Sequence, residues 1–379
     1  MKPYFSAKGI DLFWGDCREV LPQLEAESID AVVTDPPYEL GFMGKKWDAQ
    51  GIAYRVDLWR ALLRVLKPGA HLLAFGGTRT YHRQTCAIED AGFEIRDSLH
   101  WIYGTGFPKS LNLGEGRGTA LKPGHEPIVL ARKPLIGTVA ANVEKFGTGA
   151  LNIDACRIVV AEDDPNRRTT PSVADPARSM FGVSGHSGTL AQGRWPANVL
   201  LDEDAAAELD AQSGDLAAGI ARRSRGGGRN CHSDVAKPPM PDMGYGDTGG
   251  ASRFFYVAKP SRAERDIGCE DLPARSGGEA TERQDGSDGL ESPRAGAGRN
   301  GGARNHHPTV KPVELMQHLV RLVTPPRGVV LDPFMGSGST AFAAWLENLD
   351  FVGVEREAEY LEIARRRAKA RAAQLRMAL

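Results

Sequence analysis

Two parts of the chain alternate short apolar runs with helical periodicity. In the first hundred residues, the runs IDAVVT and HLLAF lie on either side of the periodic segment DLWRALLRVL. Near the other end, the runs GVVLD and DFVGVE lie on either side of a further helical pattern. Such alternation is typical of strand and helix units on a mostly parallel sheet. We therefore expect an α/β fold in which both parts of the chain share one sheet.

The segment between these two parts has a different character. Its strand-like islands RWPANVLL and SRFFYVAKP are separated by Gly, Ser, Arg and Pro. Residues 276–304 contain almost no large apolar side chain, which is typical of a disordered or mobile loop. The chain is therefore expected to have three parts: residues 1–134, an inserted region at residues 135–305, and residues 306–379.

The overall charge gives little attraction to nucleic acid. The 379 residues are 41% hydrophobic and 25% charged, which is typical of a globular protein, and the formal net charge is -1. Between Arg222 and Arg262, however, eight Lys or Arg stand against three Asp. This basic, glycine-rich stretch fits a surface that contacts a nucleic-acid backbone, and it fits a solvated loop equally well.

Cysteine spacing and hydropathy exclude other classes. The five cysteines form no C-x-x-C pair, so we expect neither a metal site nor a disulfide framework. The N-terminus lacks a signal-peptide pattern, and no apolar run approaches the ~18 residues that span a bilayer. We therefore expect a cytoplasmic protein with no membrane role.

The first motif with candidate chemistry is Asp35-Pro36-Pro37-Tyr38, the catalytic loop, which directly follows the apolar run Ile29 to Thr34. Open α/β sheets place active sites where loops leave the carboxyl ends of parallel strands. Two prolines remove backbone donors, which leaves the Asp35 carboxylate and the Pro36 carbonyl as acceptors. Such a loop suits an exocyclic amino group, and Tyr38 offers a flat surface for an extruded base. The same residues also fit a rigid turn with a capping aspartate.

The second motif is VVLDPFMGSGST, residues 329–340, which predicts a buried strand, a glycine-rich turn and a helix. Gly336 and Gly338 let the backbone pass close to a ligand, and the helix start presents free N–H groups to an anionic end. A phosphate-binding P-loop needs Lys where Ser339 stands. A nucleoside triphosphate site is therefore not expected.

An acidic residue ends the next strand, which runs from Phe351 to Val354 and is followed by Glu355. An acidic side chain in this position commonly accepts hydrogen bonds from ribose hydroxyls. By itself Glu355 is more often a helix-capping residue. Its place about one βα unit after the glycine-rich turn favours a nucleoside ligand.

These motifs resemble the amino-group DNA methyltransferases, whose hallmarks are a D-P-P-Y-type catalytic loop and a D-P-F-x-G-S-G-S/T cofactor loop. The catalytic loop comes first in this chain, as in the circularly permuted β group, where the target-recognition region lies between the two loops. The resemblance covers about 200 residues, Ile10 to Pro134 and His306 to the end. It implies a Rossmann-like fold, with a mostly parallel seven-stranded sheet and an antiparallel strand pair at the edge.

The resemblance also implies S-adenosylmethionine as the cofactor and S-adenosylhomocysteine as the product. It places the cofactor ribose at Glu355 and the adenine at Asp16 and Cys17, where Asp16 is equally well a helix N-cap. In the segment HPTVKP, Thr309 and Lys311 are expected at the cofactor carboxylate, in a stretch that also serves as a helix entry. The loop residues expected around the cofactor, chiefly its methionine part, are Asp332, Pro333, Phe334, Gly336, Ser337, Gly338 and Thr340.

Candidate DNA contacts lie in two further places. The stretches WIYGTGFPKSLN and HEPIVLARKP resemble the family's strand pair next to the target base, where Phe107 and Lys109 are candidates for base or phosphate contact. In the basic stretch, the candidates for phosphate contact are Arg222, Arg223, Arg225 and Arg229.

The implied reaction is direct methyl transfer to the amino nitrogen of a flipped base. Cytosine C5 methylation needs a Pro-Cys loop, and none of the five cysteines follows a proline. Adenine N6 is favoured over cytosine N4, because the N4 enzymes of this family usually carry Ser in place of Asp35. Enzymes that methylate RNA bases or protein glutamine place the cofactor loop first, so the reversed order in this chain favours DNA over those substrates. A catalytically silent nucleic-acid-binding module is disfavoured because both loops are intact.

We therefore expect site-specific methylation of double-stranded DNA. No nuclease signature stands out in the sequence. A stand-alone enzyme, a homodimer and the modification half of a pair with a separate restriction endonuclease all remain open.

Overall fold

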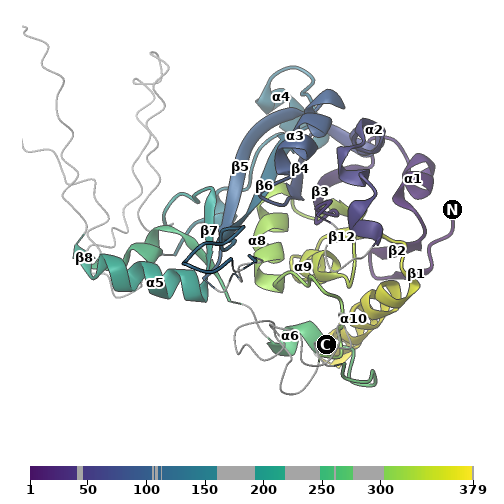
Figure 1. The fold of residues 1–379 in the computed structure, drawn as a ribbon. Helices are drawn as coiled ribbons and strands as arrows, with labels where there is room; N and C mark the ends of the chain where they lie inside the picture. The colour runs from purple at the N-terminus through teal and green to yellow at the C-terminus, as the bar shows by residue number, and fades with distance from the viewer. Residues whose placement is uncertain are drawn as a thin grey trace, which may run out of the picture.

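The computed structural model describes residues 1–40, 46–104, 106, 110–111, 113–159, 193–217, 248–259, 262–275 and 303–377. Its principal strands are β1 (Phe5–Ala7), β2 (Ile10–Trp14), β3 (Ile29–Thr34), β4 (Leu66–Phe75), β5 (Glu94–Ile102), β6 (His125–Arg132), β7 (Val199–Asp202), β10 (Tyr256–Ala258), β11 (Val329–Asp332) and β12 (Asp350–Glu355). They form one sheet in the order β1-β2-β12-β11-β3-β4-β6-β5-β7-β10 (Figure 1).

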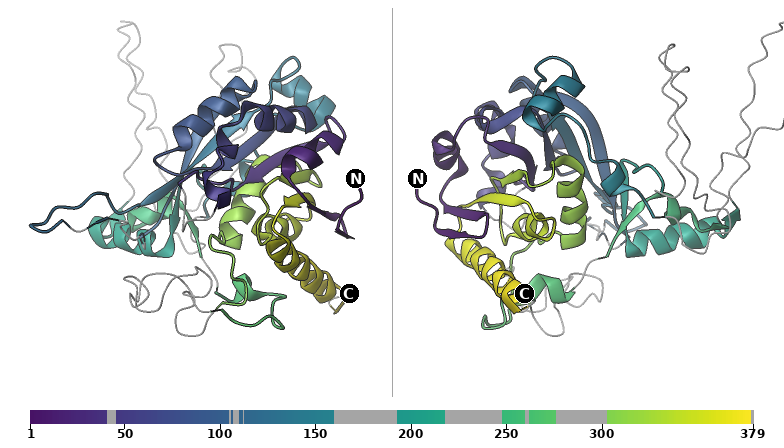
Figure 2. Two further views of the ribbon diagram at one scale, coloured as in Figure 1. Left: turned by 45° about the vertical axis from the view of Figure 1, so that its right-hand side comes forward. Right: turned by 180° about the vertical axis from the view of Figure 1, so that it is seen from behind.

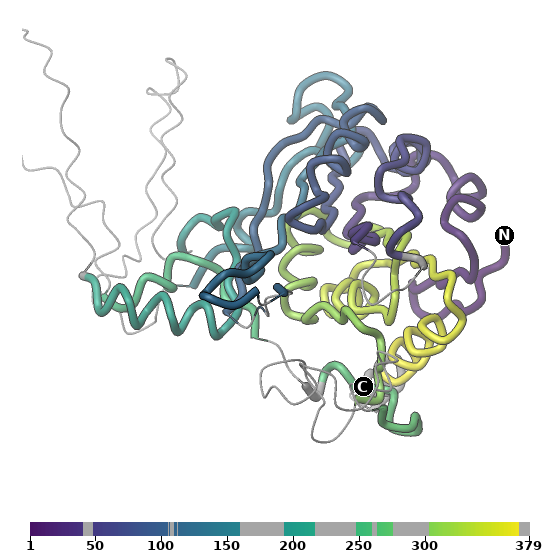
Figure 3. The backbone as a smooth tube through the Cα atoms, in the orientation of Figure 1, coloured from purple at the N-terminus to yellow at the C-terminus, as the bar shows by residue number. Residues whose placement is uncertain are grey.

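Both ends of the chain contribute to the middle of this sheet. β11 pairs parallel with β3, and β12 pairs parallel with β2, so the C-terminal strands lie between N-terminal ones (Figure 3). β3 is buried at all six positions, as expected for a central strand of a parallel sheet. The prediction that the two parts share one mostly parallel sheet is confirmed.

The predicted strand number was wrong. The sheet has ten strands in the described residues. Its antiparallel pairs are β1 with β2 at one edge, and β6 with both β4 and β5 inside the sheet. Two of the three additional strands lie in the inserted region, because its islands RWPANVLL and SRFFYVAKP contain β7 and β10, which extend the sheet beyond β5. The short strand β1 adds one more at the opposite edge. Leu200 of β7 and Ala258 of β10 are buried, so these two short strands cover an edge that would otherwise be unpaired.

Helices cover both faces of the sheet (Figures 1 and 2). Alternate residues of β3 point to opposite faces: Val32 belongs to a core cluster with Trp59 and Leu62, whereas Val33 belongs to one with Leu319. The first face carries α1 (Cys17–Val20), α2 (Val56–Val65) and α3 (Tyr81–Asp90). The second carries α8 (Val313–Val323), α9 (Ser339–Leu346) and α10 (Ala358–Met377).

The remaining elements are short or belong to the inserted region. They are α4 (Val139–Phe146), α5 (Glu203–Ser213), the two-stranded pair β8 (Leu216–Ala217) and β9 (Thr248–Gly249), and α6 (Arg262–Asp266). α5 lies at the end of the molecule farthest from the N-terminus (Figure 1). Of residues 276–304, predicted as a loop, only the last two lie within the described part of the chain. No helix in the described part is long and apolar enough to cross a bilayer.

Candidate active site

The candidate site lies where four parallel strands end. β2, β12, β11 and β3 are neighbours, and Asp16, Glu355, Asp332 and Asp35 stand at or just after their carboxyl ends. All four line one cavity of about 1190 Å³. The cavity is also lined by these residues expected from the sequence: Pro36, Pro37, Tyr38, Cys17, Thr309, Lys311, Pro333, Phe334, Gly336, Ser337 and Thr340.

Asp332 fastens the two ends of the cofactor loop, residues 332–340. Its Oδ1 accepts hydrogen bonds from the Thr34 hydroxyl at 2.7 Å and the Phe334 N–H at 3.0 Å, and its Oδ2 accepts one from the Thr340 hydroxyl at 2.6 Å. Burial raises the pKa of Asp332 to about 6. Because both oxygens and the Thr340 hydroxyl are engaged, these residues hold the loop in place at the cavity wall.

Glu355 holds the glycine-rich turn from the neighbouring strand. Its Oε2 accepts the Gly336 N–H at 2.7 Å and its Oε1 accepts the Glu357 N–H at 2.8 Å. Burial raises the pKa of Glu355 to about 7. Each carboxylate oxygen keeps a second lone pair that can accept a ligand hydroxyl.

The turn itself requires glycine at Gly336 and Gly338. Gly336 has φ +55°, and a Cβ there would lie 2.8 Å from the His307 Nε2. Gly338 has φ +81° and is the N-cap of α9, which has no side-chain cap, so N–H groups of its first turn remain for an anionic ligand. Gly338 was expected at the cofactor, but it does not line the cavity. A Cβ added to Gly338 would point to Ala364 of α10.

Asp16 is the helix N-cap that the sequence offered as one of its two roles. It caps α1 by accepting the Arg18 N–H at 2.9 Å, and it forms an ion pair of 2.6 Å with the Arg18 guanidinium, which lowers its pKa. It also lines the cavity beside Cys17. Burial raises the pKa of Cys17 to about 12, so its thiol is neutral.

The catalytic loop is held by neighbouring elements. The Asp48 carboxylate accepts the N–H groups of Glu39 and Leu40 at 3.0 and 3.2 Å, and the Thr80 hydroxyl donates to the Tyr38 carbonyl at 2.7 Å. The Asp35 Oδ2 accepts a hydrogen bond from the Lys311 Nζ at 2.7 Å. The Asp35 Oδ1 is buried and has no hydrogen-bond partner among the described residues. Asp35 thus lines the cavity with one carboxylate oxygen bound to Lys311 and the other buried without a partner among the described residues.

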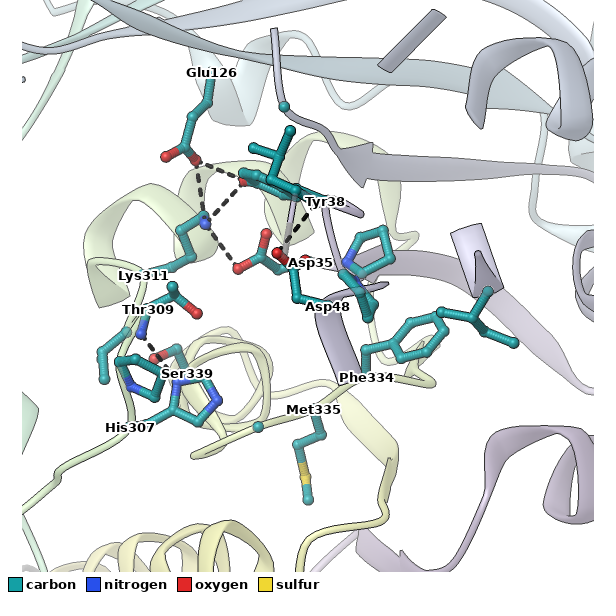
Figure 4. A pocket seen from close by; sticks show the side chains of 18 of the residues that line it. Asp35, Tyr38, Asp48, Glu126, His307, Thr309, Lys311, Phe334, Met335 and Ser339 are labelled. Carbon is teal, nitrogen blue, oxygen red and sulfur yellow. Dashed lines mark hydrogen bonds and ion pairs between the residues drawn. The ribbon is translucent and has the colours of Figure 1, made fainter. Parts of the chain in front are cut away.

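Lys311 lies among three acceptors, which with it form the Lys311 cluster: Asp35, Tyr38, Glu126 and Lys311 (Figure 4). The Lys311 Nζ is 3.1 Å from the Glu126 Oε2 and donates to the Tyr38 hydroxyl at 3.2 Å, and that hydroxyl donates to the Glu126 Oε2 at 2.8 Å. Burial alone would lower the pKa of Lys311, but the Asp35 and Glu126 carboxylates raise it above its usual value. Lys311 therefore stays charged.

Burial also shifts the acids of this cluster. It raises the pKa of Asp35, and the nearby Glu126 carboxylate adds to this, whereas the Lys311 ammonium opposes it. Burial raises the pKa of Tyr38 well above its usual value, so Tyr38 is a neutral phenol that donates to Glu126. Lys311 was expected at the cofactor carboxylate, but the two neighbouring carboxylates and the phenol hold its ammonium at the catalytic loop.

The segment before α8 is held from the inserted region. Arg265 of α6 donates to the Asn305 carbonyl at 3.0 Å and to the His307 carbonyl at 3.2 Å. Burial lowers the pKa of His307 to about 3, so its ring is neutral, and its Nδ1 accepts the Thr309 N–H at 3.3 Å. The His307 ring lies edge-on to Tyr360, with 4.4 Å between the centroids.

Three residues of this site were missed by sequence reasoning. Glu126 stands just before the apolar run of the strand HEPIVLAR, and His307 lies in the segment that supplied Thr309 and Lys311. Arg367 of α10 is 1% exposed and donates to the Ser337 carbonyl at 2.8 Å. A carboxylate next to an apolar run was the available signal for Glu126, but nothing in the pattern of α10 marks Arg367.

All six predicted DNA contacts lie outside the described residues: Phe107, Lys109, Arg222, Arg223, Arg225 and Arg229.

Comparison with known proteins gives one long match and several short ones. A family model described as DNA methylase, N6_N4_Mtase, matches residues 29–366. The type II methyltransferase M2.MboI of Moraxella bovis is 41% identical over 61 residues, which are 16% of this chain and 22% of that protein. The type II methyltransferase M.ScaI of Streptomyces caespitosus is 37% identical over 81 residues, which are 21% and 27%. The chain thus spans about a quarter of the length of these relatives.

Solved structures match over most of the chain at low identity. The cytosine-N4-specific PvuII DNA methyltransferase is 14% identical with a TM-score of 0.49, and the match covers 97% of this chain and 88% of that one. The complex of M1.HpyAVI with SAM is 15% identical with a TM-score of 0.39, and the match covers 94% and 99%.

Proposed function

The chain belongs to the N6_N4_Mtase family of DNA methylases, and from this premise we propose that it transfers a methyl group from S-adenosylmethionine to the exocyclic N6 of adenine in double-stranded DNA. One observation carries this proposal. Asp35, whose buried Oδ1 has no partner in the described structure, lines the same cavity as Gly336 and Glu355. An acceptor for an amino group and the elements of a nucleoside site thus share one space.

The residues present fit S-adenosylmethionine. The cavity of about 1190 Å³ exceeds the ~300–1,000 Å³ of typical small-molecule sites, which leaves room for a base beside the cofactor. Glu355 would accept the ribose hydroxyls, Asp16 would face the adenine amino group, and the first turn of α9 would face the carboxylate. When bound, this cofactor supplies a methyl group already activated on a sulfonium sulfur, so no protein nucleophile is required.

The protein's own part is to position the base and to accept its protons. The Asp35 Oδ1 and the Pro36 carbonyl accept the two amino hydrogens, which directs the nitrogen lone pair toward the methyl group. An amino nitrogen that has accepted the methyl group would be cationic and would have a proton to lose. Asp35 takes the surplus proton, which suits a carboxylate whose pKa burial has raised. Tyr38 stacks on the extruded base.

Adenine is favoured over cytosine by Asp35, because N4 enzymes of the resembling family usually carry Ser there. We further propose that the chain order of the two loops reflects the circularly permuted β group. In this arrangement residues 135–305 read the DNA target and residues 1–134 and 306–379 form the catalytic unit.

Expression in a host without DNA methylation tests the proposal. Nucleoside mass spectrometry of the host DNA should show N6-methyladenine with the wild-type chain and none above background with Asp35→Asn. N4-methylcytosine in place of N6-methyladenine would overturn the choice of adenine, and absence of both would overturn the methyltransferase. An Asp35→Asn chain that still methylates would overturn the role of Asp35.

A further inference from the structure

The Lys311 ammonium has all of its hydrogen-bond capacity in use. An ammonium has three N–H donors. Three acceptors surround the Lys311 Nζ: the Asp35 Oδ2 at 2.7 Å, the Glu126 Oε2 at 3.1 Å and the Tyr38 hydroxyl at 3.2 Å. No donor is left for the Asp35 Oδ1, which is the second oxygen of the same carboxylate.

Glu126 determines this division of donors. Its Oε2 binds the Lys311 Nζ directly and also receives the Tyr38 O–H at 2.8 Å, so the lone pair of that hydroxyl is turned to Lys311. Two of the three N–H groups are thereby directed away from Asp35. Figure 4 shows Glu126 and Asp35 on opposite sides of the Lys311 ammonium.

The backbone keeps Glu126 in this place. β6 pairs with β4 on one side and with β5 on the other, where Glu126 lies opposite Trp101. The Glu126 side chain is 20% exposed and that of Lys311 is 8% exposed, so water competes little for their contact. Glu126 is therefore a fixed acceptor rather than a mobile surface carboxylate.

We propose that Glu126 is a positioning residue for the methyl-transfer reaction, which holds the Lys311 ammonium off the Asp35 Oδ1 and so keeps that oxygen free for the amino group of the base. This inference rests on the proposed function. Without Glu126, the ammonium would be attracted by Asp35 alone and would bridge both carboxylate oxygens, since two charge-assisted hydrogen bonds are better than one. The base amine would then have to compete with a buried cation.

The test compares Glu126→Gln with the matched control Glu94→Gln. Glu94 begins β5 and pairs with Arg132 at 2.6 Å, and it does not line the cavity. We expect Glu126→Gln to lower the single-turnover rate of methyl transfer about 100-fold, comparable to the loss of one positioned polar group in an active site. The dissociation constant for S-adenosylmethionine should stay within about twofold of wild type. Glu94→Gln should keep the wild-type rate.

A double-mutant cycle separates positioning from direct contact with the substrate. In a Lys311→Met background no ammonium can block Asp35, so adding Glu126→Gln should cost less than about threefold. A 100-fold loss that persists in this background would overturn the inference. Loss of cofactor binding in Glu126→Gln would indicate that this variant does not fold. In that case Glu126→Asp, which keeps a carboxylate acceptor for Lys311, should retain at least a tenth of the wild-type rate. A Glu126→Asp chain that binds the cofactor but methylates more slowly than a tenth of the wild-type rate would also overturn the inference.

The two proposals fail differently. A wild-type chain that methylates neither adenine nor cytosine in DNA refutes the proposed function. A wild-type chain that methylates, with Glu126→Gln equally fast, refutes only the role of Glu126.

Discussion

At Gly336 the structure predicts a marked loss of cofactor binding from one added methyl group. Gly336 has φ +55°, where a residue with a Cβ costs about 1 kcal/mol. The added Cβ would lie 2.8 Å from the His307 Nε2, and the buried ring would have to move by a few tenths of an ångström, at a further cost of about 1 kcal/mol. Gly336→Ala therefore disfavours the observed turn by about 2 kcal/mol.

This cost should appear in the affinity for S-adenosylmethionine. The free protein can relax out of the strained turn, whereas the bound protein must adopt it, so about 2 kcal/mol corresponds to about 30-fold weaker binding. Isothermal titration calorimetry measures this directly. Gly147→Ala is the matched control, because Gly147 has φ +77° with nothing within 4 Å of a Cβ and caps α4 away from the cavity.

The contact with His307 gives a second check. His307→Ala removes the ring that the new Cβ meets, so Gly336→Ala should cost only about 1 kcal/mol in that background, or about fivefold in affinity. Gly147→Ala should lower the unfolding free energy and leave cofactor affinity unchanged. Wild-type affinity in Gly336→Ala would refute the reasoning, because the turn would then not need its present backbone to hold the ligand.

Three further predictions concern buried charges. Ionised Glu355 accepts hydroxyl hydrogen bonds more strongly than the protonated form does, and burial raises its pKa to about 7. Cofactor affinity measured by calorimetry should therefore weaken as the pH falls below 7, and Glu355→Gln should remove this dependence. Burial lowers the pKa of His71 to about 4, so between about pH 6.5 and 4 this side chain is protonated in the unfolded chain and neutral in the folded one. Between pH 6.5 and 4 the unfolding free energy measured in urea should therefore fall less in His71→Gln than in wild type. An equal dependence of the unfolding free energy on pH in the two chains would contradict this. Arg367→Met leaves the Ser337 carbonyl without its donor and should lower the unfolding free energy by about 2 kcal/mol in urea titrations, whereas an unchanged midpoint would show that the bond contributes nothing.

The sheet and the loops at its edge could be predicted because they depend on local patterns. The buried run of β3 and the alternation of apolar runs with helical periodicity identify strands, and the carboxyl ends of parallel neighbours must meet at one edge. Asp35 and Glu355 could therefore be expected near each other from two short motifs. The strand count was underestimated because β1, β7 and β10 are only three, four and three residues long, too short for a periodic pattern to decide whether they join the sheet.

The pairing of charges inside the site could not be predicted, because it depends on register between distant segments. Asp35 and Lys311 are 276 positions apart, and Glu126 comes from a third segment. A shift of one residue in β6 would turn the Glu126 side chain to the opposite face of the sheet, away from Lys311. Local sequence shows that each of these residues is charged, but only the assembled sheet determines which acceptor the ammonium binds and which oxygen of Asp35 is left free. That unpartnered oxygen is the feature on which the proposed chemistry depends, so the proposed function of the D-P-P-Y loop also depends on two segments that the motif itself does not contain.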